Sequence, residues 1–309
     1  MMREMKAYVR QSAESRVVEL ADVPVPEIDE HEVLVEIHGF GVGIHDRYFI
    51  PSDASFPYPI GTEGAGIIAQ IGRKVADFRI GDRVILSTSL QPKGGTWAQF
   101  AAVPENSLIR MPDELDFVRA AGIPVAGASA LESLGALDLT EGDTLFVAGA
   151  SGAIGTLVIQ LAAVRGVRVV GSASRKNHEY MRSLGAEKTV DYSNSDWQEQ
   201  VREWMPGGVD AALAIQPGTG VDSMAVVRNG GKVITVSGDS FAPERGITVR
   251  QFMHHRETRR QVIRLAHDIA AGQIQLVIER VYPFDRAIEA LEKTETRHAR
   301  GKIVVSIST

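Results

Sequence analysis

The 309-residue sequence contains no cysteine. Disulfides, thiolate catalysis and cysteine-ligated zinc are therefore excluded. The sequence also lacks an apolar run of membrane-spanning length and an N-terminal signal segment, so we expect a cytoplasmic protein without a membrane partner. Because the net charge is −6, nucleic acid is not expected as a partner either.

The chain is long enough for two domains, and its 44% apolar and 23% charged residues are ordinary for a globular protein. Residues 3–104 are predicted to be rich in strands, because short β-rich runs alternate there with proline and glycine. These runs are 6–10, 17–20, 33–38, 66–71 and 84–86. A β-rich region that precedes a strand–helix–strand unit indicates two differently built domains.

The stretch 143–176 predicts a strand, a glycine turn, a helix and a second strand. The first strand is the apolar run 144–148, and the helix follows from apolar residues at helical spacing between Ile154 and Ala162. In such a turn, glycines allow the backbone to approach a pyrophosphate, while the helix supplies free N–H groups. We therefore predict a dinucleotide site rather than an ordinary tight turn. It comprises Gly149, Ala150, Ser151, Gly152, Ala153 and Ile154.

The end of the second strand indicates which dinucleotide binds. An NAD site usually has a carboxylate there for the ribose 2′-hydroxyl, whereas this sequence has hydroxyls and cations: Ser172, Ser174, Arg175 and Lys176. The cations would attract the 2′-phosphate of NADPH. We therefore predict NADPH as the cofactor, the alternative being that the two cations only begin a solvated helix.

Further strands are predicted at 188–191, 209–215 and 231–237, with an edge strand from Ile247 to Val249. Gln216 and Gly238 follow two of these strands at the edge where doubly wound sheets bind ligands, so both are predicted to contact the cofactor. A helix is expected to start at Pro112–Asp113 and to continue through 117–121. The amphipathic segment 256–271 predicts a solvated helix, and the final strand is expected at 302–307.

Several motifs, taken in their order along the chain, resemble the medium-chain dehydrogenase/reductase family. They are Gly61-Thr-Glu-Gly-Ala-Gly, Ile71-Gly, Phe78-Arg-Ile-Gly-Asp-Arg-Val, Gly149-Ala-Ser-Gly-Ala-Ile-Gly, Leu184-Gly-Ala, Asp191-Tyr, Gly230-Gly-Lys and Gly301-Lys-Ile-Val. The resemblance covers nearly the whole chain. It implies a GroES-like β-barrel catalytic domain (1–112 and 254–309) and a Rossmann NADP(H)-binding domain with a doubly wound parallel sheet (113–253), with the active cleft between them.

Within this family, the sequence resembles the zinc-independent, zeta-crystallin-like quinone oxidoreductases. Zinc-dependent members have a Cys, then Ser or Thr two residues later, then Asp, and further on a His-Glu pair. This sequence has Gly43, His45 and Asp46 at the first place and Thr62-Glu63 at the second. Because catalytic zinc needs three protein ligands, we predict no metal site and zinc-free catalysis.

The resemblance also implies roles for single residues. Members often have an asparagine at the place of Gly43 that helps to hold the nicotinamide. His45 replaces a proton-relay hydroxyl and could protonate the substrate, or it is an ordinary loop histidine. Tyr48 either lines the cleft or packs beside Phe49 and Phe56. Ser129 stands where threonine is usual near the cofactor, and Tyr192 matches a tyrosine near the adenosine phosphate.

Together these features predict a reductase that transfers hydride from NADPH to a quinone or an α,β-unsaturated carbonyl compound. A non-catalytic, crystallin-like NADPH-binding protein is the alternative, whereas the barrel signature argues against a Rossmann methyltransferase. The family also implies a homodimer that pairs the edges formed by Ile247–Val249. The alternative is a monomer in which Arg245 and Arg250 guard that edge.

Overall fold

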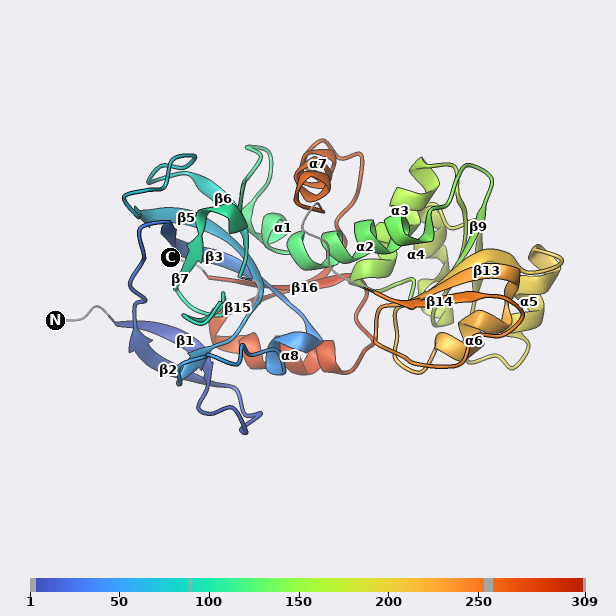
Figure 1. The fold of residues 1–309 in the computed structure, drawn as a ribbon, viewed down its shortest axis with the longest axis horizontal. Coiled ribbons are helices and arrows are strands. Elements are labelled where there is room, and N and C mark those ends of the chain that lie inside the picture. Colours follow the sequence, from blue (N-terminus) through green and yellow to red (C-terminus); the bar gives the residue numbers. More distant parts are fainter. Residues whose placement is uncertain (1–3, 89–90, 253–257, 308–309) are drawn as a thin grey trace. The chain divides into compact units, whose positions relative to one another are not determined.

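The computed structural model describes residues 4–88, 91–252 and 258–307. The chain forms two compact units, which are seen in Figure 1: unit 1 is Met1–Val125 with Ile278–Thr309, and unit 2 is Ala126–Val277. The sequence placed the first domain boundary between residues 112 and 113. Its other boundary, between 253 and 254, lies outside the described residues.

Unit 1 contains a three-stranded and a seven-stranded sheet, which confirms the predicted β-rich domain. The smaller sheet has the order β2 (Glu19–Pro24), β1 (Glu4–Arg10), β4 (Tyr58–Pro59). The larger sheet has the order β15 (Ile278–Pro283), β16 (Lys302–Ser306), β3 (Glu32–Val42), β5 (Glu63–Ile71), β6 (Arg83–Ser87), β8 (Leu108–Arg110), with β7 (Phe100–Pro104) paired to β3. The C-terminal segment therefore returns to this unit as strands beside β3.

The core of unit 1 is built around large buried side chains, among them Phe40 and Trp97, whose rings stack 4.9 Å apart. Two helices pack on its strands: α1 (Phe117–Ala121) and α8 (Ala287–Glu295). The prediction that the first helix starts at Pro112 is wrong. Residues 112–115 form a turn, and α1 starts after Asp116, whose carboxylate accepts a hydrogen bond from the Arg119 backbone N–H at 2.8 Å.

Unit 2 has one six-stranded sheet in which every neighbouring pair is parallel. The order is β11 (Lys188–Val190), β10 (Arg168–Ser172), β9 (Thr144–Ala148), β12 (Val209–Ala214), β13 (Val227–Thr235), β14 (Thr248–Gln251). The order reverses between β9 and β12, so the predicted doubly wound sheet is confirmed. All five residues of β9 are buried, as expected for a strand covered on both faces.

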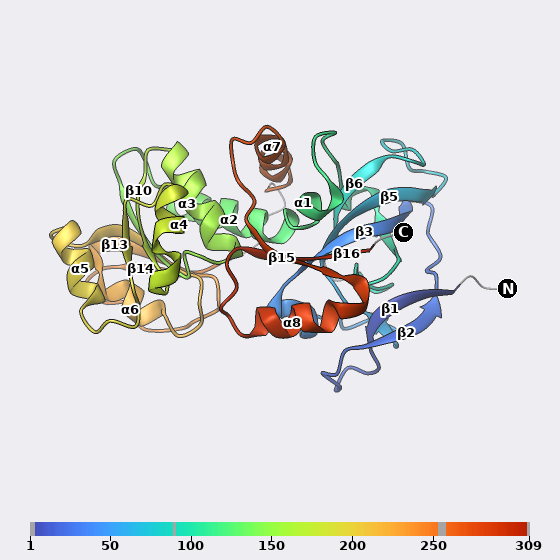
Figure 2. The same ribbon diagram turned by 180° about the vertical axis from the view of Figure 1, so that it is seen from behind.

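Helices cover both faces of this sheet. In Figures 1 and 2, α3 (Ala153–Val164) and α4 (His178–Ser183) lie on one side of the strands, and α5 (Trp197–Trp204) and α6 (Gly220–Ala225) lie on the other. The unit also contains α7 (Thr258–Ala270) and most of α2 (Pro124–Leu137). Across the described residues, no helix combines the length and apolar character needed to cross a bilayer.

Candidate active site

The glycine turn of unit 2 brings its backbone closer to other groups than a side chain would allow. Gly149 has φ +85°, and a Cβ there would lie 2.9 Å from Cγ of Gln216. At Gly155 a Cβ would lie 2.6 Å from Cα of Ala150, so α3 can approach the turn only with glycine at this position. These are the contacts that a dinucleotide fingerprint requires.

The start of α3 leaves donors available for an anion. Its N-cap residue, Gly152, provides no side-chain hydrogen bond to the first turn, whose N–H groups follow at Ala153 and Ile154. Free N–H groups and the positive end of the helix dipole favour a bound phosphate. The turn and helix therefore fit the pyrophosphate of a dinucleotide.

Hydroxyl groups gather beside this turn. The amide of Asn177 donates to Oγ of Ser151 at 3.1 Å and to Oγ of Ser174 at 3.4 Å. Ser172 is buried, and its carbonyl accepts from the N–H groups of Gly149 and Ala150. Sequence reasoning missed Asn177, although it directly follows the predicted cations.

Arg175 and Lys176 are exposed, and neither side chain forms an ion pair with any described residue. A carboxylate directly after β11 contacts this loop: Asp191 accepts from the Arg175 N–H at 3.0 Å and from Oγ of Ser193 at 2.6 Å. The hydrogen bond from Ser193, with backbone N–H groups, lowers the pKa of Asp191. Asp191 is therefore an ionised loop anchor that the sequence analysis did not identify.

The loops after β12 and β13 are joined by Asp239. Its two carboxylate oxygens accept from the N–H groups of Gly218 and Gly220, each at 3.1 Å. Burial raises the pKa of Asp239, but these hydrogen bonds outweigh burial and lower it. Asp239 thus fixes the turn that begins with Gln216, over Gly149. Gly238, just before it, has φ +80°.

Two other predicted cofactor residues of unit 2 lie in contrasting surroundings. Ser129, in α2, is only 4% exposed. Tyr192, after β11, is 51% exposed. Only Tyr192 therefore presents most of its side chain to a ligand from solvent.

Unit 1 contains a short chain of hydrogen bonds around the 3₁₀ helix Ile44–Arg47. His45 Nε2 lies 2.8 Å from Thr62 Oγ1, and Thr62 donates to Asp46 Oδ1 at 3.1 Å. Because the threonine proton points to Asp46, the Thr62 oxygen is left to accept from His45 Nε2–H. Asp46 is 1% exposed and also accepts from Gly43 N–H at 2.8 Å. The free ring nitrogen of His45 is then Nδ1.

Gly43 and His45 occupy one space. A Cβ at Gly43 would lie 2.7 Å from His45 Nδ1, so the imidazole fills the volume that a side chain at residue 43 would take. A larger side chain at residue 43 and the present position of the His45 ring therefore exclude each other.

Aromatic side chains are exposed beside His45. Tyr48 is 45% and Phe49 is 56% exposed, and the rings of His45 and Phe49 are 5.6 Å apart. The guanidinium of Arg16 lies 5.3 Å from the Tyr48 ring centre. Tyr48 is thus a surface residue rather than a core residue, as a substrate-contacting role requires.

Glu63, which stands where zinc-dependent members have the glutamate of a His-Glu pair, forms an ion pair. It is buried and pairs with Lys302, also buried, while its Oε2 accepts from the Val125 N–H at 2.7 Å. Within residues 4–88, 91–252 and 258–307, no group of three or more His, Cys, Asp or Glu side chains is arranged to hold a metal.

Comparison with known proteins identifies the family. Residues 29–113 match the alcohol dehydrogenase GroES-like domain, and residues 184–305 match the zinc-binding dehydrogenase model. An NADPH-dependent alkenal/one oxidoreductase from Arabidopsis thaliana is 31% identical, over 98% of this chain and 80% of that protein. The human quinone oxidoreductase is 25% identical, over 92% of each chain.

Solved structures agree with the fold. The quinone oxidoreductase from Coxiella burnetii superposes with a TM-score of 0.91, at 24% identity, over 99% of this chain and 100% of that chain. The order of motifs, the two units and these relatives lead to the same assignment. The chain belongs to the medium-chain dehydrogenase/reductase family, in the branch that contains the quinone and alkenal/one oxidoreductases.

Proposed function

We propose that this protein reduces an α,β-unsaturated carbonyl compound or a quinone with hydride from NADPH, without zinc. The observation that carries the proposal is the 31% identity to an NADPH-dependent alkenal/one oxidoreductase over nearly the whole chain. A 2-methylene-furan-3-one reductase from Solanum lycopersicum, 29% identical over 92% of this chain, supports an enone substrate. Quinone oxidoreductases at 25% identity support the quinone alternative.

NADPH is proposed because the end of β10 carries Arg175 and Lys176 and no carboxylate. The glycine turn and the start of α3 would hold the pyrophosphate, and Ser151 and Ser174 would face the adenosine half. Asp191 lies close to this loop, but its oxygens already accept hydrogen bonds from Arg175 N–H and Ser193. Bound NADPH supplies the hydride, which adds to the electrophilic carbon of the substrate.

His45 is proposed to supply the proton that completes the reduction. Its Nε2–H is directed to Thr62, and Thr62 is directed to buried Asp46. This arrangement fixes the ring, leaves Nδ1 for the substrate and places a carboxylate 3.5 Å from Nε2 to stabilise the imidazolium. Exposed Tyr48 and Phe49 would contact the planar substrate beside it.

Turnover separates this function from the crystallin-like alternative. NADPH oxidation is measured with a panel of alkenals, enones and quinones, and we expect it to require an electrophile. A protein that binds NADPH tightly but turns over none of these compounds would be the non-catalytic alternative. Activity should survive chelation, and metal analysis of the active protein should find no stoichiometric zinc.

The proton donor is tested with His45→Gln. We expect kcat for the enone to fall by about 10²–10⁴-fold, the usual contribution of general acid catalysis, and the pH dependence due to this group to disappear. Dissociation of NADPH should stay unchanged. An unaltered pH profile would assign His45 a packing role only.

The preference for NADPH is tested with Arg175→Ala/Lys176→Ala. Because both cations would contact the 2′-phosphate, the Kd for NADPH should rise by at least tenfold while that for NADH changes little. Arg165→Ala, at the exposed C-cap of α3, is the matched control. Equal weakening of both cofactors would contradict the assignment. We also propose that the protein is cytoplasmic and forms a homodimer.

A further inference from the structure

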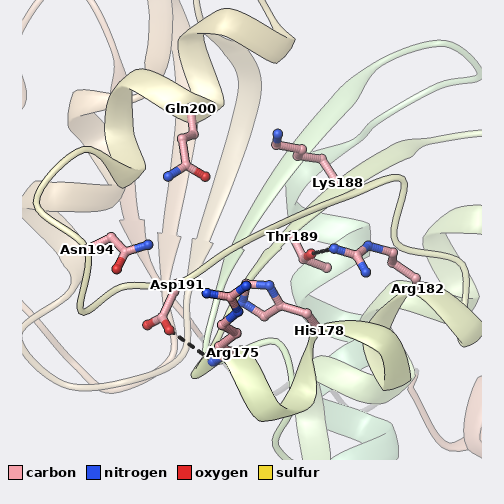
Figure 3. Close-up of a pocket in the computed structure, with 8 residues that line it drawn as sticks. All are labelled: Arg175, His178, Arg182, Lys188, Thr189, Asp191, Asn194 and Gln200. Atoms are coloured by element: carbon pink, nitrogen blue, oxygen red, sulfur yellow. Dashed lines mark hydrogen bonds between the residues drawn. The ribbon is translucent and has the colours of Figure 1, made fainter.

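A second group of cations lies along the outer edge of the sheet in unit 2. β11 is one of the two outer strands of this sheet, and a pocket of about 290 Å³ opens beside it, between α4 and α5. The residues around it are drawn in Figure 3. They are Arg175, His178, Arg182, Lys188, Thr189, Asp191, Asn194 and Gln200.

The pocket is strongly cationic. Arg175, Arg182 and Lys188 form no ion pair with any residue in the described part of the chain. Arg182 donates one hydrogen bond, to Oγ1 of Thr189 at 2.9 Å, which leaves the rest of its guanidinium available. Glu187, next to Lys188, does not neutralise the pocket because both its oxygens are bound to Arg168.

The single carboxylate in the lining is already satisfied. Asp191 accepts from the N–H groups of Arg175 and Ser193 and from the Ser193 hydroxyl, at 2.6–3.0 Å. A ligand therefore meets three cationic side chains and one carboxylate that already accepts hydrogen bonds from local donors.

The polar lining also suits an anion. His178 Nε2 lies 3.1 Å from the Ala173 carbonyl, which can only accept, so Nε2 carries the proton and Nδ1 is left for other partners. In Figure 3, the side chains of Arg175 and His178 lie together, and Lys188 and Gln200 lie across the pocket from them. Groups that bind phosphate therefore face one space from two sides.

We propose that this pocket binds a phosphate monoester. Guanidinium and ammonium groups are the side chains that recognise phosphate dianions, and the volume leaves room for the group that carries the phosphate. Two sources share this chemistry: the 2′-phosphate of NADPH, reached through Arg175, or a separate phosphorylated molecule. The first source rests on the proposed function, whereas the second does not.

The test uses Arg182→Gln/Lys188→Gln, which removes two cations that lie outside the predicted dinucleotide site. Its control is Arg165→Gln/Arg202→Gln, which removes two cations of the same unit outside the pocket. Calorimetry on the full chain measures NADPH, NADH and, with NADPH saturating, inorganic phosphate and glycerol 3-phosphate. Turnover is not needed for these readouts, so they remain interpretable if the proposed reductase activity fails.

If the pocket takes the 2′-phosphate, the variant should bind NADPH at least fivefold more weakly and NADH equally well. If it takes a separate ligand, phosphate or glycerol 3-phosphate should bind the wild type with NADPH present, and the variant should lose this binding at least fivefold. Either result supports the site. If NADPH affinity is unchanged and neither phosphate compound binds the wild type, the proposal is overturned and the cations are a solvated edge.

Discussion

At the scale of single residues, the candidate site is distinguished by the close packing of the His45 ring against Gly43. The imidazole of His45 takes the volume of a side chain at residue 43, and Thr62 and Asp46 hold the ring there. The family resemblance implies an asparagine at residue 43 in many members, and its amide would need that same space. This protein instead places a group there that can donate a proton.

The coupling of these two residues predicts a non-additive pair of substitutions. Gly43→Asn alone should lower kcat by at least tenfold, because the amide cannot coexist with the His45 ring. Gly43→Asn in a His45→Ser background should cost little beyond His45→Ser alone, because the obstacle is gone. Steady-state kinetics on the four proteins measures the coupling. Additive effects would show that the two side chains do not share one space.

At the scale of secondary-structure elements, a buried ion pair joins β16 to β5 across β3. Lys302 reaches Glu63 over Gly41, where a Cβ would lie 2.7 Å from the Glu63 Cδ and 2.8 Å from the Lys302 Cε. Glu63 also accepts from Val125 N–H, at the start of α2. The pair therefore fixes three strands and one helix start.

Lys302→Met should lower the free energy of unfolding by about 3–5 kcal/mol, because it leaves a buried carboxylate without its cation. Chemical denaturation measures this loss. Adding Glu63→Gln should recover much of it, since the isolated charge is removed. If the single variant matches the wild type, the ion pair contributes nothing to stability.

A second element-scale prediction concerns the carboxylate that joins β12 to β9. Asp210 accepts from Thr144 N–H at 2.8 Å and from its hydroxyl at 2.7 Å, and it pairs with Arg228 at 2.7 Å. Burial raises the pKa of Asp210, but these contacts outweigh burial and lower it. Since the folded pKa lies below the unfolded value, the ionised form stabilises the protein above about pH 4.

Asp210→Asn should therefore reduce the free energy of unfolding near pH 7 by about 1–2 kcal/mol. The difference from the wild type should shrink as the pH falls below about 4, through the folded pKa of Asp210. Denaturation at a series of pH values tests this. Asp138→Asn is the control, and a difference that stays constant with pH would contradict the prediction.

At the scale of the whole molecule, an exposed edge of the sheet in unit 2 bears on the state of assembly. β14 is the outer strand at the end of the six-stranded sheet opposite β11, and its Thr248, Arg250 and Gln251 are exposed. Ile247, expected in the edge strand, is instead 3% exposed in the core, so Ile247→Lys would damage folding rather than test the edge. Arg245 does not guard the edge freely, because it donates to the Val227 and Met224 carbonyls. Of the two arginines predicted to guard the edge, only Arg250 remains exposed on β14. A second copy of the chain could cover this edge.

We expect light scattering at micromolar concentration to give a mass near twice 33.5 kDa. Thr248→Lys places a charge on the edge without touching the core and should shift the protein towards monomer. Ser195→Lys, at an exposed loop position of the same unit, should leave the mass unchanged. A wild-type mass near one chain would rule out the dimer.

The sequence by itself determined the family, the two-part architecture and the glycine turn. These follow from local patterns: the run 144–148 has the same bounds as β9, because a strand buried on both faces is apolar throughout. The positions of Gly149 and Gly155 follow from the turn that they must form. Local patterns do not determine the ends of elements as closely. Both Pro112 and Asp116 are residues that can begin a helix, and α1 begins after Asp116.

Only the tertiary structure decided which distant side chains act together. Thr62, directly before β5, meets His45 of the 3₁₀ helix Ile44–Arg47. Lys302 reaches Glu63 from the far end of the chain, and Asp191, directly after β11, reaches the predicted cofactor loop. No local spacing in the sequence encodes these contacts, because the order of the strands in each sheet brings the distant segments together. The family and the architecture therefore follow from local sequence patterns, whereas the tertiary fold selected the partners of each candidate site residue.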